Sequence, residues 1–256
     1  MHGLKSFLIA FSLYSKIPMP QFPWKDEDMR YTLCFFPLVG VVIGGCVFLW
    51  WMLCETFALP TLCCTAIGAA IPLLVTGGFH VDGFLDTMDA FRSYQPREKK
   101  LEILQDSHIG AFAVISFAIY GLLYLGAFSL LEHSRLVGIV CLSFCLARCL
   151  SGIAVVSFPA AKKKGLLFLF ASRSHRRIVR WSLYLQGAGC VVGMVLLSPL
   201  CGAAATVAAL LSFLYYYYRT KKELGGITGD TAGYFVLLCE ESVLLATGAM
   251  ELFSLG

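Results

Sequence analysis

Seven long apolar runs constrain this chain more than any other feature of its sequence. Each is close to the roughly 20 residues that an α-helix needs to cross the hydrocarbon core of a bilayer. Across the chain 58% of residues are hydrophobic and 14% are charged, whereas a soluble domain is usually about 25% charged. The sequence therefore predicts an all-α fold, a polytopic membrane helix bundle formed by residues 1–256 as a single domain. The expected spans are 33–53, 57–78, 109–131, 136–158, 178–198, 200–218 and 233–254.

The segments outside these runs predict how the chain sits in the membrane. Residues 4–17 are apolar but too short to span, so we expect an N-terminal interfacial helix there. Nearly all Lys and Arg residues fall in alternate connecting segments, beginning with the N-terminal one. By the positive-inside rule the N-terminus is then cytoplasmic and the C-terminus external. Every charged segment that carries a motif would lie on the cytoplasmic side of a bacterial inner membrane.

An acidic stretch follows the second run. Asp82, Asp86 and Asp89 stand at i, i+4 and i+7, and no Lys or Arg separates them. This spacing places the three carboxylates near one face of a helix, where they repel each other unless a cation lies between them. Carboxylate oxygens suit Mg²⁺ or Mn²⁺, so the pattern favours a metal site over a solvated acidic face. His80 precedes them and suits either a base or a structural hydrogen bond.

A second acidic series follows in the same connecting segment. Glu98, Glu102 and Asp106 repeat at intervals of four residues, so we expect them to share the face of a second helix. Asp106 is thereby added as a fourth candidate ligand for the metal.

A glycine-rich turn precedes the last apolar run, and it reads GGITGDT from Gly225 to Thr231. Such a turn can direct backbone N–H groups and Thr hydroxyls at a phosphate, although it can also simply end a helix. Thr228 and Gly229 are candidate contacts to substrate. Asp230 is either a further ligand or the N-cap of the last helix.

Charged residues also occur inside the predicted spans. Arg148, Glu240 and Glu241 would be costly if they faced lipid. Either Arg148 and Glu240 pair within the bundle, or they line a cavity that reaches into it. The basic loop 162–180 is explained mostly by membrane orientation, and a subset of its charges is suited to an anionic substrate or to lipid headgroups.

Two motifs and a tail element carry a resemblance to a known family. The motifs read GGFHVDGFLDTMD from Gly77 to Asp89 and LEILQDSHIGA from Leu101 to Ala111, and the tail reads GGITGD. Together they resemble the cobalamin synthase family of adenosylcobinamide-GDP ribazoletransferases. The resemblance implies a membrane enzyme of vitamin B12 assembly. Such an enzyme transfers the adenosylcobinamide phosphate moiety of adenosylcobinamide-GDP to α-ribazole or its 5′-phosphate and releases GMP, with Mg²⁺ as cofactor.

The resemblance also implies roles for individual residues. Catalysis would involve His80, Asp82 and Asp106, and the metal would be held by Asp82, Asp86, Asp89 and Asp106. The substrate would contact Arg148, Thr228, Gly229, Asp230 and Glu240. One departure is the run Lys163-Lys164-Gly165-Leu166-Leu167, where the family pattern has an acidic residue and Gly-Leu-Gly.

Two other functions match parts of this pattern. A CDP-alcohol phosphatidyltransferase-like enzyme also uses clustered Asp residues, but Asp82-Gly83 is not followed by its Ala-Arg pair. A membrane transporter is less favoured, because the chain has no visible internal repeat. The expected partners are the two substrates and the lipid bilayer, with no nucleic acid, and a homo-oligomer is left open.

Overall fold

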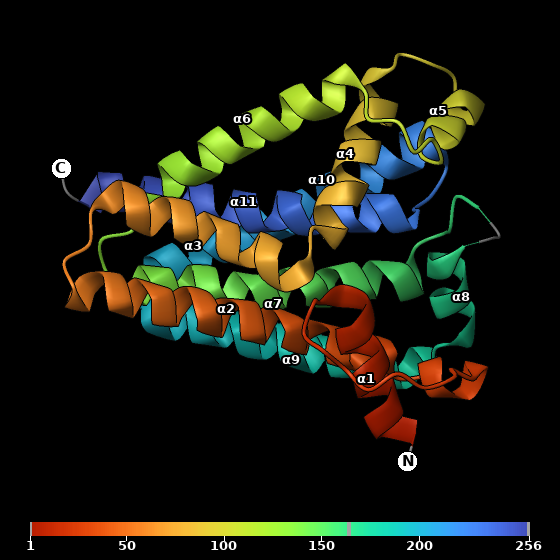
Figure 1. Ribbon diagram of the computed structural model, residues 1–256, viewed down its shortest axis with the longest axis horizontal. Coiled ribbons are helices and arrows are strands. Elements are labelled where there is room, and N and C mark those ends of the chain that lie inside the picture. The colour runs from red at the N-terminus through yellow and green to blue at the C-terminus, as the bar shows by residue number, and fades with distance from the viewer. Residues whose placement is uncertain (1, 163–164, 255–256) are drawn as a thin grey trace.

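The structure is a computed structural model, and it describes residues 2–162 and 165–254. Lys163 and Lys164, where the departure from the family pattern falls, lie outside these residues. The described chain is helical throughout, as the sequence predicts (Figure 1). Its elements are α1 (His2–Tyr14), η1 (Asp26–Met29), α2 (Thr32–Thr56), α3 (Thr61–Thr76), α4 (Phe79–Arg92), α5 (Arg97–Ile103), α6 (Ala111–Phe128), α7 (Ser134–Ser157), α8 (Leu166–Arg173), α9 (Arg176–Leu197), α10 (Pro199–Leu224) and α11 (Gly229–Ser254).

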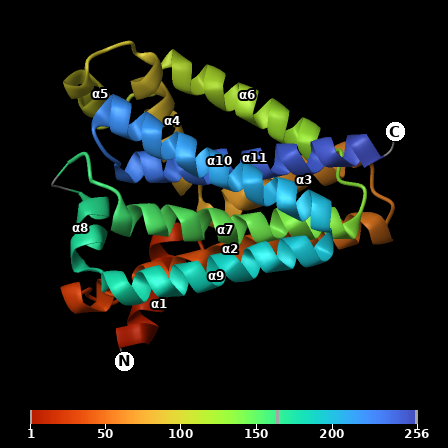
Figure 2. The same cartoon turned by 180° about the vertical axis from the view of Figure 1, so that it is seen from behind.

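The long helices run roughly along the longest axis of the molecule, and the short ones gather at one end. Helices α2, α3, α6, α7, α9, α10 and α11 form the bundle, while α1, α5 and α8 lie at the end opposite the C-terminus (Figures 1 and 2). Helix α7 lies in the core, where it packs on α2, α9 and α11. It is apolar on nearly all sides, which is typical of a helix that other helices surround.

Fewer helices meet the requirements of a span than the seven that the sequence predicts. In the described chain α2, α6, α7, α9 and α10 are long and apolar enough to cross a membrane. Helices α3 and α4 count as a sixth span only if they are taken as one broken span. Helix α11 runs for 26 residues and is not among these candidates. The predicted membrane helix bundle is confirmed. By length and composition, five helices of the described chain qualify as spans on their own, or six if the bent pair is counted as one span, against about seven expected.

Two consecutive glycines redirect the chain between α3 and α4. Gly77 and Gly78 have φ angles of 63° and 78°, which place both in the left-handed region that glycine adopts without strain. The two helices differ in direction by 95°. Lys16 covers this turn, and its backbone N–H donates to the carbonyl of Val75 at 2.7 Å. We therefore treat α3 as the crossing segment and α4 as a helix that lies across the bundle, outside the span.

Helix α4 crosses the first turns of α11 at very short range. A Cβ on Gly83 would lie 2.6 Å from the backbone oxygen of Asp230, and one on Gly233 would lie 3.2 Å from the backbone oxygen of His80. Small residues at a helix crossing allow the two backbones to approach in this way. The crossing brings the acidic face of α4 to the beginning of α11.

Candidate active site

A polar cavity lies where α4 meets the N-terminus of α11. Its volume is about 300 Å³. Helix α4, the loop after α5, the segment before α8 and the segment that begins α11 all contribute to its wall. It is lined by Phe79, Asp82, Gly83, Gln105, Lys162, Gly165, Leu167, Ile227, Thr228, Gly229 and Asp230. Residues from three regions that the sequence singles out therefore meet in one place.

A short backbone pairing holds the basic loop against the glycine-rich turn. The N–H of Ile227 donates to the carbonyl of Pro159, and the N–H of Ala161 donates to the carbonyl of Ile227, both at 2.9 Å. This pairing fixes Lys162 at the cavity, where its Nζ donates to the carbonyl of Leu101 at 2.6 Å. Burial lowers the pKa of Lys162, and the nearby charge of Asp230 opposes this shift.

The first turn of α11 forms one wall of the cavity. The N–H of Thr231 donates to Oγ1 of Thr228 at 3.2 Å, and the N–H of Thr228 donates to Oγ1 of Thr231 at 2.9 Å. Thr228 is thus the N-cap, and Asp230 lies inside the first turn. The free N–H groups and the partial positive charge of a helix N-terminus favour an anion at such a position.

Asp82 and Asp230 line the cavity, and Asp86 lies outside its lining but close enough for its charge to interact with theirs. Burial and the charges of Asp82, Asp230 and Asp89 raise the pKa of Asp86 to about 6. Burial also raises the pKa of Asp230. Among the described Lys and Arg residues, none forms an ion pair with Asp82, Asp86 or Asp230. This concentration of negative charge suits a bound cation.

The carboxylates at the cavity fit Mg²⁺ if water and substrate phosphates complete its coordination. In the described chain no group of three or more His, Cys, Asp or Glu side chains is arranged to hold a metal ion. Mg²⁺ is commonly held by one or two carboxylates together with water and substrate phosphates. Asp82, with either Asp86 or Asp230, offers such a pair. A cage of protein ligands alone is not formed.

Asp89 has a structural task in this arrangement. Its Oδ2 accepts from the N–H of Gly110 at 2.6 Å, and its Oδ1 accepts from the N–H of Ala113 at 2.8 Å. The carboxylate therefore caps the N-terminus of α6 from another helix. Asp89 does not line the polar cavity.

Asp106 lies outside the helix to which the sequence assigns it. Helix α5 ends at Ile103, so the prediction that Asp106 shares a helical face with Glu98 and Glu102 is wrong. The chain turns instead, and Oδ1 of Asp106 accepts from the N–H of His108 at 3.0 Å. That hydrogen bond, with the contact to the His108 ring, lowers the pKa of Asp106. Asp106 is exposed and does not line the polar cavity.

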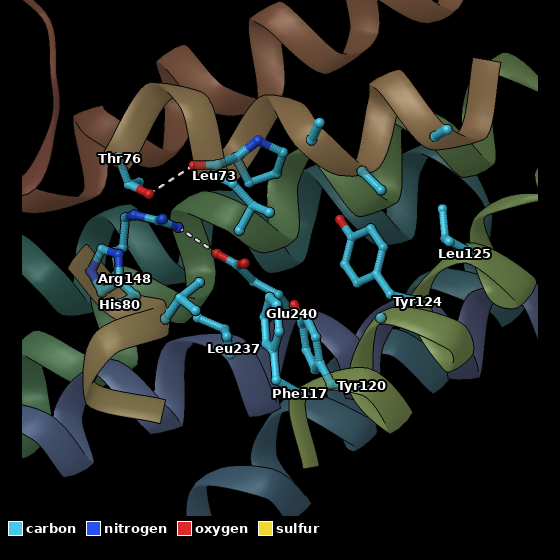
Figure 3. A pocket seen from close by; sticks show the side chains of 16 residues that line it. Leu73, Thr76, His80, Phe117, Tyr120, Tyr124, Leu125, Arg148, Leu237 and Glu240 are labelled. Carbon is cyan, nitrogen blue, oxygen red and sulfur yellow. Dashed lines mark hydrogen bonds and ion pairs between the residues drawn. The ribbon is translucent and has the colours of Figure 1, made fainter. Parts of the chain in front are cut away.

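A second, apolar cavity of about 270 Å³ lies between α3, α6 and the core helices. Arg148 and Glu240 form part of its wall, and Nη1 of Arg148 donates to Oε1 of Glu240 at 2.6 Å (Figure 3). Both alternatives for these residues thus hold, since they form a buried ion pair and also line a cavity. His80 is 3% exposed and lines this apolar cavity rather than the polar one.

Sequence reasoning missed three contributors to the polar cavity. Lys162 belongs to a basic run that membrane orientation explains, so nothing in the pattern sets it apart. Gln105 precedes Asp106 and is uncharged, so the acidic pattern does not single it out. Gly83 belongs to the first motif, but its close approach to α11 depends on tertiary packing that the sequence does not show.

Comparison with known proteins agrees with the sequence motifs. The family model for cobalamin-5-phosphate synthase matches residues 6–248. A relative from Lachnoclostridium phytofermentans, named adenosylcobinamide-GDP ribazoletransferase, is 44% identical over 98% of this chain and 96% of its own length. Relatives with the same name from Desulfitobacterium hafniense and Acinetobacter baumannii are 33% and 32% identical, over 98% and 97% of this chain and 99% and 98% of their own lengths. No solved structure matches significantly. The chain belongs to the cobalamin-5-phosphate synthase family.

Proposed function

We propose that this protein is an adenosylcobinamide-GDP ribazoletransferase that acts at the cytoplasmic face of a bacterial inner membrane. It transfers adenosylcobinamide phosphate from adenosylcobinamide-GDP to α-ribazole or α-ribazole 5′-phosphate. The products are adenosylcobalamin or its 5′-phosphate, and GMP. The observation that carries the proposal is the polar cavity, in which Asp82, Lys162 and the N-terminus of α11 surround a space suited to a diphosphate.

The reaction needs one phosphorus–oxygen bond to form and one to break. A ribose hydroxyl of α-ribazole attacks the phosphorus that is attached to the cobinamide. The bond from that phosphorus to the bridging oxygen breaks, and GMP leaves with the electron pair. The hydroxyl proton passes to Asp230, which lines the cavity and is left free when Asp82 and Asp86 hold the metal. His80 is not assigned this role, because it lines the apolar cavity.

The side chains of the polar cavity divide the binding of the diphosphate between them. Lys162 and the first-turn N–H groups of α11 bind phosphate oxygens, because both present positive charge to the same cavity. Asp82, with Asp86 or Asp230, would hold Mg²⁺. When bound, Mg²⁺ neutralises the charge that develops on the phosphates during transfer.

The cytoplasmic assignment rests on the distribution of charge. The polar cavity, α5 and α8 are formed by segments that contain most of the Lys and Arg residues, at the end of the bundle opposite the C-terminus (Figure 1). The positive-inside rule assigns such segments to the cytoplasm. The guanosine nucleotide would then meet the enzyme on the side of the membrane where nucleotides are made.

The test is GMP release by the purified, detergent-solubilised protein from adenosylcobinamide-GDP and α-ribazole 5′-phosphate. We expect release with Mg²⁺ and at least about a hundredfold loss without it. Asp82→Asn should lose activity to a similar degree, because it removes a charge from the cavity. Glu98→Gln is the matched control, since Glu98 is exposed on α5.

Two results would contradict the proposal. One is a folded wild-type protein that releases no GMP under these conditions. The other is full activity in Asp82→Asn, which would remove the polar cavity from the reaction.

A further inference from the structure

Three of the eleven cysteines lie close together where α2 ends and α3 begins. Cys54 is in the last turn of α2 and is 4% exposed, whereas Cys63 and Cys64 are half-buried in the first turn of α3. The thiols of Cys54 and Cys64 form a hydrogen bond with each other. Cys63 lies near Cys54 without such a hydrogen bond. Two of the three thiols are therefore in direct contact across the connection between the helices.

Several hydrogen bonds hold Cys64 beside Cys54. The N–H of Leu59 donates to the carbonyl of Cys54 at 3.0 Å, and the thiol of Cys64 donates to the carbonyl of Leu59 at 3.6 Å. The indole N–H of Trp50 donates to the carbonyl of Cys64 at 2.9 Å. Positions 50 and 54 share one face of α2, so these contacts keep Cys64 against that face. A disulfide forms only where the fold brings two cysteines this close.

The position of this pair favours oxidation. The connection between α2 and α3 lies at the same end of the bundle as the C-terminus (Figure 1). Its residues 57–60 include no Lys or Arg, and the positive-inside rule assigns such a connection to the external side. Glu55 is exposed beside Cys54, so this level of α2 lies at the membrane surface rather than in the hydrocarbon core. Disulfides form and persist outside the cytoplasm and are rare within it.

We propose that Cys54 and Cys64 form a disulfide bond on the external side of the membrane, which ties the beginning of α3 to the end of α2. Helix α3 has 16 residues and packs mainly on α2 and α6, and its other end redirects the chain into α4. The bond would fix the external end of this short helix. The inference uses the proposed orientation of the bundle but not the proposed reaction.

The bond forms by exchange with a disulfide of the thiol–disulfide oxidoreductase class. The thiolate of Cys64, which is partly accessible, attacks one sulfur of the oxidant, and the other sulfur leaves as a thiolate. Cys54 then attacks Sγ of Cys64, and the first sulfur of the oxidant leaves in turn. The oxidant gains two electrons and takes up the two thiol protons, so it ends as a dithiol. Cys54 needs no contact with the oxidant, because Cys64 already lies beside it.

The test is the thiol state of the full chain in a bacterial host whose periplasm oxidises thiols. Cells are quenched with acid, free thiols are blocked with N-ethylmaleimide, and the peptides of the purified protein are identified by mass. We expect one pair of peptides joined through Cys54 and Cys64, lighter than the two separate peptides by the mass of two hydrogens. Cys54→Ser and Cys64→Ser should abolish the pair. Cys63→Ser is the matched control and should keep it, because Cys63 is adjacent to Cys64 and also half-buried.

Thermal unfolding of the wild-type protein in detergent, with and without a reductant, gives a second readout. We expect reduction to lower the midpoint by about 5 °C, because the reduced chain gains freedom when it unfolds. The reductant should not change the midpoint of Cys64→Ser. This comparison needs no substitution of the buried Cys54, so it holds even if a variant at that position does not fold.

Three results would overturn the inference. One is N-ethylmaleimide on both Cys54 and Cys64 in wild-type protein from the oxidising host. Another is a bond that survives Cys64→Ser and disappears in Cys63→Ser, which would make Cys63 the partner of Cys54. The third is an equal midpoint for the oxidised and the reduced wild-type protein, because the bond would then not stabilise the contact between α2 and α3. None of these readouts measures GMP release, so the result does not depend on the proposed function.

Discussion

The aspartates of the two motifs have different roles in the structure. Asp82 lines the polar cavity, Asp89 caps α6, and Asp106 lies in an exposed turn. Helical spacing correctly predicts that Asp82, Asp86 and Asp89 lie close enough for their charges to interact. It could not predict that the N-terminus of α6 meets Asp89, because that contact joins residues more than twenty positions apart.

A substitution at Asp89 should affect stability before chemistry. We expect Asp89→Ala to lower the free energy of unfolding by about 1 kcal/mol, because α6 loses its cap. Thermal unfolding in detergent measures this loss. The concentration of Mg²⁺ that gives half-maximal GMP release should stay the same. A shifted Mg²⁺ requirement with unchanged stability would instead identify Asp89 as a metal ligand.

Substitution of Glu240, which belongs to the buried ion pair, should reduce stability much more than substitution of its neighbour Glu241. Arg148 and Glu240 are 1% and 4% exposed. Glu240→Gln leaves the Arg148 charge without a counter-charge, and breaking a buried pair costs about 3–5 kcal/mol. Glu241→Gln is the matched control, because no described cation pairs with Glu241. Thermal unfolding of both variants gives the comparison.

A double variant checks the physical reason. Arg148→Met combined with Glu240→Gln should recover much of the lost stability, because no unpaired buried charge remains. If the double variant is as unstable as Glu240→Gln alone, the loss comes from packing rather than from the charge.

At the scale of the elements, the sequence predicts the helices better than their directions. Pro199 separates α9 from α10 as expected, and it stands at the first position of its helix, where proline is favoured. The predicted span 57–78 corresponds to α3, which ends at Thr76. Hydropathy could not show that the chain then turns by 95°, because the turn depends on backbone angles and on packing against α11.

The crossing of α4 and α11 sets the geometry of the polar cavity. Gly83→Ala places a Cβ against the backbone of Asp230, so the two helices must move apart and Asp82 moves relative to Asp230. A shift of about 1 Å can cost about a hundredfold in rate. We expect kcat for GMP release to fall by roughly that factor.

Gly189→Ala on α9 is the control for this crossing, because an added Cβ there meets no atom within 4 Å. It should leave kcat unchanged. Wild-type kcat in Gly83→Ala would mean that the crossing does not position the reacting groups.

At the scale of the whole molecule, the charged connecting segments lie together at one end of the bundle. The N-terminus and the charged segments lie at one end, and the C-terminus lies at the other (Figure 1). The alternation of Lys and Arg along the sequence predicts this separation of ends. Acidic residues in α11 face the core, and a hydropathy run does not show which way a charged side chain points.

Reporter fusions test the orientation of the bundle. A reporter fused after the C-terminus should be read as external, and one inserted between α4 and α5 should be read as cytoplasmic. The reason is that an odd number of bundle helices, α6, α7, α9, α10 and α11, separates these positions in the proposed topology. Paired alkaline phosphatase and fluorescent-protein fusions give the two readings. A cytoplasmic C-terminus would require one of these bundle helices to lie outside the membrane.

The turn at Gly77 and Gly78 also has a consequence for the lipid. It ends α3 after 16 residues, a length of about 24 Å, whereas the hydrocarbon core of a bilayer is about 30 Å thick. A segment shorter than the bilayer thins the lipid beside it or leaves its ends to be covered by neighbouring side chains. We therefore expect the bilayer to be thinner beside α3 than elsewhere, so that headgroups and their water come closer to Asp82.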